Sequence, residues 1–570
     1  MTWDGPSIVS RISRSSILCS QPRFCENRVP VPASDPSPPP ASPVSPVSPA
    51  PLDAAAPDAD ATTRAAGRGG LAIGVAKVSF ILFGFAQQLI LPRILGVDGY
   101  GEISRVLAVV GVVNNVIVAS AIQGVSRAVT SVPEDRADEA FRRTLSLHAA
   151  VAVIVSTGFA LLAGLIADAI SAPHITAPLR LVAAVILLYG VYAPLVGALN
   201  GRRRFVTQAA LDIAYGAMRM VSIAGGALVF LKLGRSAVLG AAAGFVLAAT
   251  LIVPIAASRT GLGRRGTAGP TTGEHLAFLV PLLISQSFLN LLLQTDFLIF
   301  SHFAGDAAAR MGLGPKPADE LVGVYRGVQL FAFLPYQLLM SVTFILFPML
   351  ARAHAEHDRE AVRRYTMTGV RIAMLLTGLL CAPIAGLNQH VLRLAYQEAI
   401  WSQGGEALRI HALGMGAFAI LGILSTALTS LRLERVAATL TGVSVALVAA
   451  GCVLAVPLAP FGPRMIVHSA IATGAALALA ALVSAFVLRC LAGGVVAPLV
   501  PLRVALAVAV TVALGSRLPW ISKPVVVVEA AALGLVYLVA LVLLGELGRA
   551  DLATLKRVFS GRRGRERPAP

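Results

Sequence analysis

The sequence has little charge and few cysteines for its length. Asp, Glu, Lys and Arg make up 13% of 570 residues, against 56% hydrophobic residues. A soluble domain of this length carries more surface charge, so composition excludes a large soluble protein. The cysteines lie in the N-terminal segment or inside apolar runs, without paired or metal-ligand spacing, and we expect no disulfide framework, metal or cofactor. They are Cys19, Cys25, Cys381, Cys452 and Cys490.

Long apolar runs fill the chain from about residue 71 to 547, separated by short loops that carry Arg. A run of about 20 apolar residues spans the hydrocarbon core as a helix, and barrel strands are much shorter. The pattern predicts an all-α polytopic membrane protein with about fourteen transmembrane helices. The expected helices are 71–94, 102–126, 145–170, 178–199, 207–231, 236–257, 275–304, 321–350, 366–388, 406–430, 436–458, 465–488, 501–518 and 524–546.

The basic residues predict the orientation of these helices. The net charge is +18, but the bases lie at helix ends and in the C-terminal tail instead of forming one stripe, so we expect no nucleic-acid partner. Alternate loops are richer in Arg and Lys, and such loops face the cytoplasm. This asymmetry predicts a multi-pass protein of the inner (cytoplasmic) membrane with both termini inside and membrane lipids as neighbours.

The chain divides into five predicted regions. Residues 1–66 are a Pro- and Ala-rich leader expected to be disordered, or upstream sequence translated from an over-early start codon. Residues 95–105 are echoed by residues 319–326, which favours two pseudo-symmetric six-helix lobes. The remaining regions are an N-terminal lobe at 67–260, a C-terminal lobe at 270–490, two additional helices at 500–547, and a basic cytoplasmic tail at 548–570.

Several short motifs occur in order between about residues 70 and 500. Residues 91–101 (LPRILGVDGYG) look like the first-helix motif ARxLGxxxYG of prokaryotic polysaccharide flippases. Companion motifs lie at 201–205 (GRRRF), 294–298 (QTDFL), 323–325 (GVY) and 346–352 (LFPMLAR). Together they resemble the polysaccharide/oligosaccharide flippases of the multidrug/oligosaccharidyl-lipid/polysaccharide exporter superfamily.

This resemblance implies a fold and a transport activity. The family's fold is a two-lobed, alternating-access transporter that turns lipid-pyrophosphate-linked sugars from the inner to the outer leaflet. The expected substrate is therefore a lipid-linked oligosaccharide for a surface polysaccharide such as lipopolysaccharide, and polysaccharide assembly enzymes would be its partners.

Ionisable and polar side chains within the predicted helices are the candidates for substrate binding. A charge at the centre of a membrane helix costs about 2.5 kcal/mol or more, so each needs an explanation. Most such charges in the N-terminal half are cations, and a cationic cavity suits a pyrophosphate. The predicted substrate-binding residues are Lys77, Gln88, Arg93, Arg105 and Arg219. For Arg93 and Arg105, snorkelling to the membrane interface is an equal alternative.

Two carboxylates and one further Arg have either a coupling or a structural role. Asp212 and Arg219 lie seven residues apart on one helix face, where they would neutralise each other. Asp296 would form an interhelical hydrogen bond or pair with Arg326 or Arg371; the functional alternative is an ion-coupling carboxylate.

Uncharged polar residues also recur inside the predicted helices. Gln286, Asn290 and Gln294 follow one another every four residues, a stripe that does not face lipid. Asn114 and Asn115 lie in the middle of the second helix, and we expect one of them to face a cavity.

Other functions compete with the flippase hypothesis. A cation-coupled multidrug exporter of the same superfamily would favour membrane-embedded carboxylates, whereas cations are more numerous here. An integral-membrane glycan polymerase or glycosyltransferase needs catalytic outer loops, and the longest outer loops are short. A structural or regulatory membrane protein is the remaining alternative. No P-loop or nucleophile motif occurs, so we do not expect an enzyme.

Overall fold

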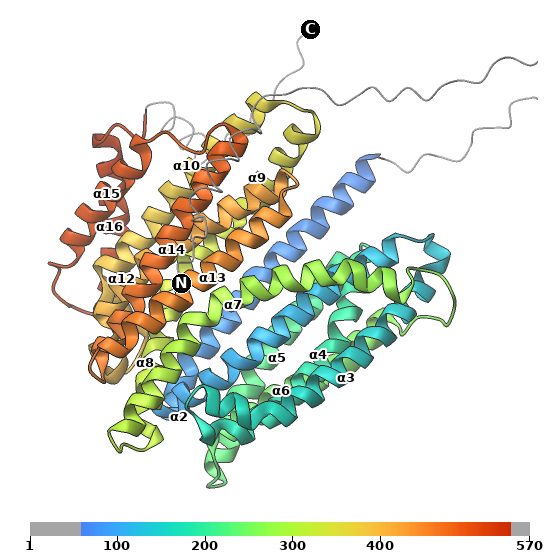
Figure 1. Cartoon of the computed structure of the whole chain (residues 1–570), viewed down its shortest axis with the longest axis horizontal. Coiled ribbons are helices and arrows are strands. Elements are labelled where there is room, and N and C mark those ends of the chain that lie inside the picture. Colours follow the sequence, from blue (N-terminus) through green and yellow to red (C-terminus); the bar gives the residue numbers. More distant parts are fainter. Residues whose placement is uncertain (1–58, 549–570) are drawn as a thin grey trace, which may run out of the picture. The chain divides into compact units, whose positions relative to one another are not determined.

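The computed structural model describes residues 59–548, apart from the side chains of 59–69, 71, 340–342, 344 and 345. Most of the predicted leader and tail thus lie outside the described residues. Helix α2 begins at Ala59, inside the range predicted for the leader. The helices are α2 (Ala59–Thr130), α3 (Ala137–Ala169), α4 (Thr176–Gly201), α5 (Phe205–Lys232), α6 (Ala237–Thr260), α7 (Thr272–Arg310), α8 (Pro315–Ala332), α9 (Leu334–Ala355), α10 (Arg359–Gly386), α11 (Asn388–Ala395), α12 (Glu398–Ser430), α13 (Glu434–Ala455), α14 (Pro463–Ala492), α15 (Leu499–Gly515) and α16 (Lys523–Leu543) (Figure 1).

Helix α2 is two helices joined at Gly96. Gly96 has φ 76° and ψ 172°, a backbone conformation that residues with a Cβ rarely adopt. Pro92, one turn earlier, removes a helical hydrogen-bond donor. The first two predicted spans, 71–94 and 102–126, therefore lie on either side of this break.

The structure confirms an all-α polytopic membrane fold. Eleven helices of the described chain are long and apolar enough to cross a membrane, and one of them, from Ala72 to Thr130, contains two predicted spans. Helix α15 is shorter, with 17 residues, and predicted span 321–350 is divided into α8 and α9 around Phe333. Each predicted range lies mostly within helix, but the count of fourteen stays a prediction.

Several helices begin earlier than the apolar pattern indicates. Helix α3 begins at Ala137 instead of 145, and α12 at Glu398 instead of 406. Their first turns carry Asp138 and Glu139, or Glu398, which favour a helix N-terminus. Apolarity marks where a helix crosses hydrocarbon, whereas helical structure continues into the polar region of the bilayer.

Helices α3 to α6 pack with part of α2 into the N-terminal lobe. Helices α5 and α6 approach so closely that a Cβ on Gly244 would lie only 1.9 Å from the carbonyl oxygen of Ser222. Small residues allow such backbone contact in membrane bundles.

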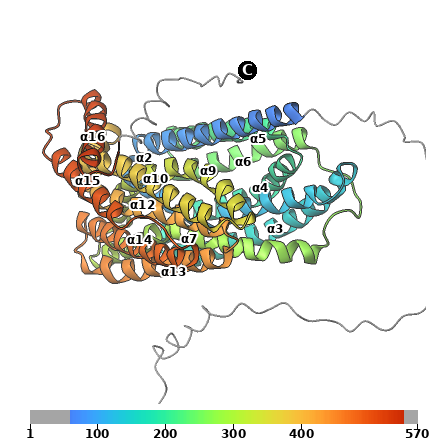
Figure 2. The same ribbon diagram turned by 90° about the horizontal axis from the view of Figure 1, so that it is seen from above.

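Helices α7 to α14 form the C-terminal lobe, and α15 and α16 pack beside α10 (Figure 2). The buried carboxylate of Glu546, just beyond α16, accepts hydrogen bonds from Arg371 of α10 (2.7 Å) and Arg503 of α15 (3.2 Å). These charges fasten the two additional helices to the C-terminal lobe.

The two echoed sequence segments pack against each other. A Cβ on Gly101 would lie 1.8 Å from the carbonyl oxygen of Asp319, and one on Gly323 would lie 2.2 Å from that of Val97. This approach joins the second half of α2 to α8 at the predicted outer end of the molecule. We call it the outer contact.

Candidate functional site

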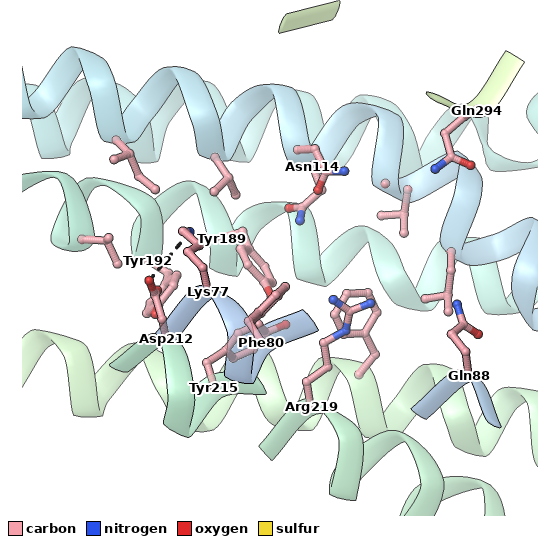
Figure 3. Close-up of a pocket in the computed structure, with 18 of the residues that line it drawn as sticks. Lys77, Phe80, Gln88, Asn114, Tyr189, Tyr192, Asp212, Tyr215, Arg219 and Gln294 are labelled. Carbon is pink, nitrogen blue, oxygen red and sulfur yellow. Dashed lines mark ion pairs between the residues drawn. The ribbon is translucent and has the colours of Figure 1, made fainter. Parts of the chain in front are cut away.

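A cavity of about 410 Å³ lies between α2, α4, α5, α6, α7 and α8. Figure 3 shows its lining, which combines charged, amide and aromatic side chains. We call it the central cavity. Its charged and amide residues are Lys77, Gln88, Asn114, Asn115, Gln208, Asp212, Arg219, Gln294 and Arg326, and its aromatic residues are Phe80, Tyr189, Tyr192, Tyr215 and Phe245.

Two arginines from different lobes face this space. The guanidinium carbon of Arg219 on α5 lies 5.0 Å from the Phe245 ring centroid, and that of Arg326 on α8 lies 5.1 Å from the Phe297 centroid. Arg326 also donates to Gln329 at 3.1 Å. Within residues 59–548, neither arginine forms an ion pair with a carboxylate. An adjoining cavity of about 360 Å³ is also lined by both. Both cations thus retain donors for an anion.

Lys77 lines the same cavity from the first half of α2. Its Nζ lies 4.0 Å from a carboxylate oxygen of Asp212, and its side chain is 62% exposed (Figure 3). Asp212 therefore pairs with a neighbouring helix and not with Arg219, its expected partner on α5.

Arg93 and Arg105 lie outside the lining of the central cavity. Arg93 donates to the carbonyl oxygen of Ala395 at 2.9 Å. Arg105 is fully buried in the outer contact, with its Nη1 2.9 Å from Asp319. A snorkelling Arg105 would reach the membrane interface, whereas this side chain is buried. Substrate binding by Arg93 or Arg105 stays a prediction.

Asp296 forms the interhelical hydrogen bonds expected of a structural carboxylate. Its Oδ2 accepts from the Tyr325 hydroxyl at 2.7 Å and from Gln329 Nε2 at 2.9 Å. His411 Nε2 lies 3.7 Å away. Arg326 reaches this network through Gln329. The ion-coupling role of Asp296 stays a prediction.

The aromatic lining is the part of the site that the sequence did not reveal. Tyr189 and Tyr192 lie in α4, whose sequence is strongly apolar and contains no stripe of polar residues. A signal did exist in α5, where Gln208, Asp212 and Tyr215 recur at spacings of four and three residues and so share one helix face. Asn114 and Gln294, expected to face a cavity or avoid lipid, both line the central cavity.

The sequence matches one protein-family model. Residues 66–354, just over half of the chain, match the family described as polysaccharide biosynthesis protein. The chain belongs to this family. No curated protein matches it. Within the part that the structure describes, no group of three or more His, Cys, Asp or Glu residues could hold a metal ion.

Several solved structures with the same fold are described as transporters or as a flippase. The chain is similar to "Lipid II flippase MurJ, inward closed conformation", with a TM-score of 0.66 and 12% identity over 86% of this chain and 99% of that one. An inward-facing multidrug resistance MATE family transporter of the MOP superfamily is similar with a TM-score of 0.59 and 15% identity, over 74% of this chain and 98% of that one. A MOP superfamily transporter from Pyrococcus furiosus is described as having a binding pocket of reverse polarity. Its TM-score is 0.54 and its identity 15%, over 74% of this chain and 95% of that one.

Proposed function

We propose that this membrane protein is a lipid-linked oligosaccharide flippase. It moves a pyrophosphate-linked glycan across the inner membrane for surface polysaccharide synthesis, by alternating access and without covalent chemistry. The observation that carries the proposal is the pair Arg219 and Arg326, which face one cavity from two lobes and form no ion pair with a carboxylate among residues 59–548.

Two unneutralised guanidinium groups suit one particular anion. A cation in a dry site is unfavourable unless it is paired, and attraction to a phosphate is strengthened where water is excluded. Arg presents forked donors that match phosphate oxygens, and pyrophosphate has two phosphates for two arginines. Lys77 adds a third, more exposed cation to the same cavity.

The family and the fold support the same substrate class. The family is defined by polysaccharide biosynthesis, and one structural neighbour is described as a lipid II flippase. The outer contact suits a state that is closed toward the predicted outside, in which a substrate reaches the cavity from the inner leaflet.

A multidrug exporter is the second candidate, and Asp212 is the observation that favours it. A carboxylate that lines the same cavity as the rings of Phe80 and Tyr215 suits an organic cation. Its pairing with Lys77 and the surplus of arginines favour an anionic substrate instead.

Deletion of the gene distinguishes the two candidates. A flippase deletion leaves lipid-linked oligosaccharide in the inner leaflet and removes surface polysaccharide, and the wild-type gene restores it. Arg219→Ala or Arg326→Ala, at wild-type membrane abundance, should restore little. Arg180→Ala is the matched control, because Arg180 is exposed and outside the cavity. Normal polysaccharide in the deletion strain, together with sensitivity to cationic dyes, would support the exporter instead.

A further inference from the structure

The central cavity has two chemically different ends (Figure 3). Gln88, Arg219 and Gln294 lie toward one end, which continues into the adjoining cavity. Tyr192 and Asp212 lie together with Lys77 toward the other. The two arginines account for a pyrophosphate, and the tyrosines of the other end have no role in that account.

Three tyrosine rings form a packed cluster at the aromatic end. The Tyr189 centroid lies 5.3 Å from Tyr215 and 5.9 Å from Tyr192, both edge to face, and the Tyr192 and Tyr215 centroids lie 5.9 Å apart. Phe80 stacks on Tyr215 at 6.4 Å and is 37% exposed. Such mutual contacts fix the rings and their hydroxyl groups in place.

Four polar atoms around this cluster have no hydrogen-bond partner in the described part of the chain. They are the hydroxyl groups of Tyr192 and Tyr215 and the side-chain oxygens of Asn114 and Gln208, all of them buried. The four side chains are between 3% and 7% exposed. A buried polar atom without a partner is unfavourable, and these four line one cavity, so together they indicate a ligand that is rich in hydrogen-bonding groups.

A sugar is the ligand class that matches these groups. Each sugar hydroxyl both donates and accepts, as needed opposite phenol hydroxyls and amide oxygens. A lipid acyl chain would leave every one of these atoms unpartnered. An organic cation would compete with Lys77 for Asp212, whose charge is already offset.

We infer that Tyr192, Tyr215, Asn114, Gln208 and Asp212 form a sugar-binding subsite, which holds the sugar next to the pyrophosphate. This inference rests on the proposed function, since the pyrophosphate between Arg219 and Arg326 places the first sugar beside Tyr215. The exposed ring of Phe80 packs against the apolar face of the sugar, and Asp212 accepts from its hydroxyls.

Binding of paired probes to the purified full-length protein tests the subsite. The probes are geranyl pyrophosphate and the same molecule carrying glucose, galactose or N-acetylglucosamine on its terminal phosphate. Wild type should bind at least one glycosylated probe about tenfold more tightly than geranyl pyrophosphate, as expected for one or two additional hydrogen bonds. Tyr192→Phe and Asn114→Leu should abolish this difference and leave the affinity for geranyl pyrophosphate unchanged.

Two further variants separate failure of the subsite from failure of the proposed function. Arg219→Ala should weaken binding of all probes, whereas Tyr365→Phe, outside the cavity, should change none. Equal affinity of wild type for every probe, or a gain that survives both subsite substitutions, would overturn the sugar subsite. The proposed function would be overturned if the wild-type protein bound none of the pyrophosphate probes, or if Arg219→Ala bound them all as tightly as wild type.

Discussion

The guanidinium of Arg105 lies 2.9 Å from the carboxylate of Asp319, and both side chains are buried where α2 meets α8. His174 Nε2 lies 2.9 Å from the other oxygen of the same carboxylate. This ion pair joins one lobe to the other at the outer contact. Removing Asp319 leaves Arg105 buried without its ion-pair partner, and removing Arg105 leaves Asp319 with His174 alone. Loss of one partner costs about 3–5 kcal/mol in comparable buried pairs.

Breaking this pair should open the predicted outer side. In Arg105→Ala, a cysteine introduced at the cavity residue Asn115 should react faster with a membrane-impermeant thiol reagent added outside. Exchanging the charges, with Arg105→Asp and Asp319→Arg together, should restore part of the protection. Unchanged labelling in Arg105→Ala would show that the pair does not hold the outer side closed.

The two glycines of the outer contact give a steric test of the same closure. Gly101→Val places a Cβ within 1.8 Å of the Asp319 carbonyl oxygen, so the helices must separate. We expect transport to fall at least tenfold at normal membrane abundance. Gly158→Val is the matched control, because Gly158 lies outside both cavities and no atom beyond its own stretch of helix backbone lies within 4 Å of a Cβ there. Equal transport by the two variants would contradict close packing at Gly101.

Asp296 tests whether the buried network of the C-terminal lobe is structural. Asp296→Asn keeps an oxygen that accepts from Tyr325 or Gln329, so stability should fall by about 1 kcal/mol and transport should persist. Asp296→Ala leaves both donors without an acceptor and should cost about 2 kcal/mol or more. Thermal unfolding in detergent and transport are measured on each variant. An Asn variant of normal stability without transport would instead support the ion-coupling role.

Glu546 fastens α15 and α16 to the C-terminal lobe through Arg371 and Arg503. Glu546→Ala leaves two arginines without their carboxylate and should lower the free energy of unfolding by about 3 kcal/mol. Lower thermal stability than the Arg180→Ala control in detergent would bear this out. Equal stability would mean that the Glu546 carboxylate contributes nothing to holding the two helices in place.

The sequence predicted the fold far better than the placement of its cations. Helical spans follow from apolarity, a local property, and the break at Gly96 follows from a Gly next to a Pro-bearing turn. Arg105, predicted to bind substrate, packs in the outer contact, and Arg326, predicted to have a coupling or structural role, lines the central cavity; both roles stay predictions. Spacing along one helix cannot distinguish them, because the neighbouring lobe decides which face meets a cavity and which meets protein.

The sequence did not predict the cluster of Tyr189, Tyr192 and Tyr215 for a related reason. A tyrosine in an apolar helix packs equally well in a core or beside a cavity, and only the unpartnered hydroxyls of Tyr192 and Tyr215 distinguish the two. Whether those hydroxyl groups find a partner is decided only when α4 and α5 pack together.

The most direct test of the account is flipping of a fluorescent polyprenyl-pyrophosphate glycan by the purified protein in vesicles. Arg219→Ala and Arg326→Ala should each lower the rate at least a hundredfold, since we propose that both bind the same pyrophosphate. Their double variant should be little worse, because the two arginines act together. Arg219→Lys should recover only part of the rate, because it lacks the forked donors. Flipping at the wild-type rate by both alanine variants, with Arg180→Ala as reference, would contradict the central claim.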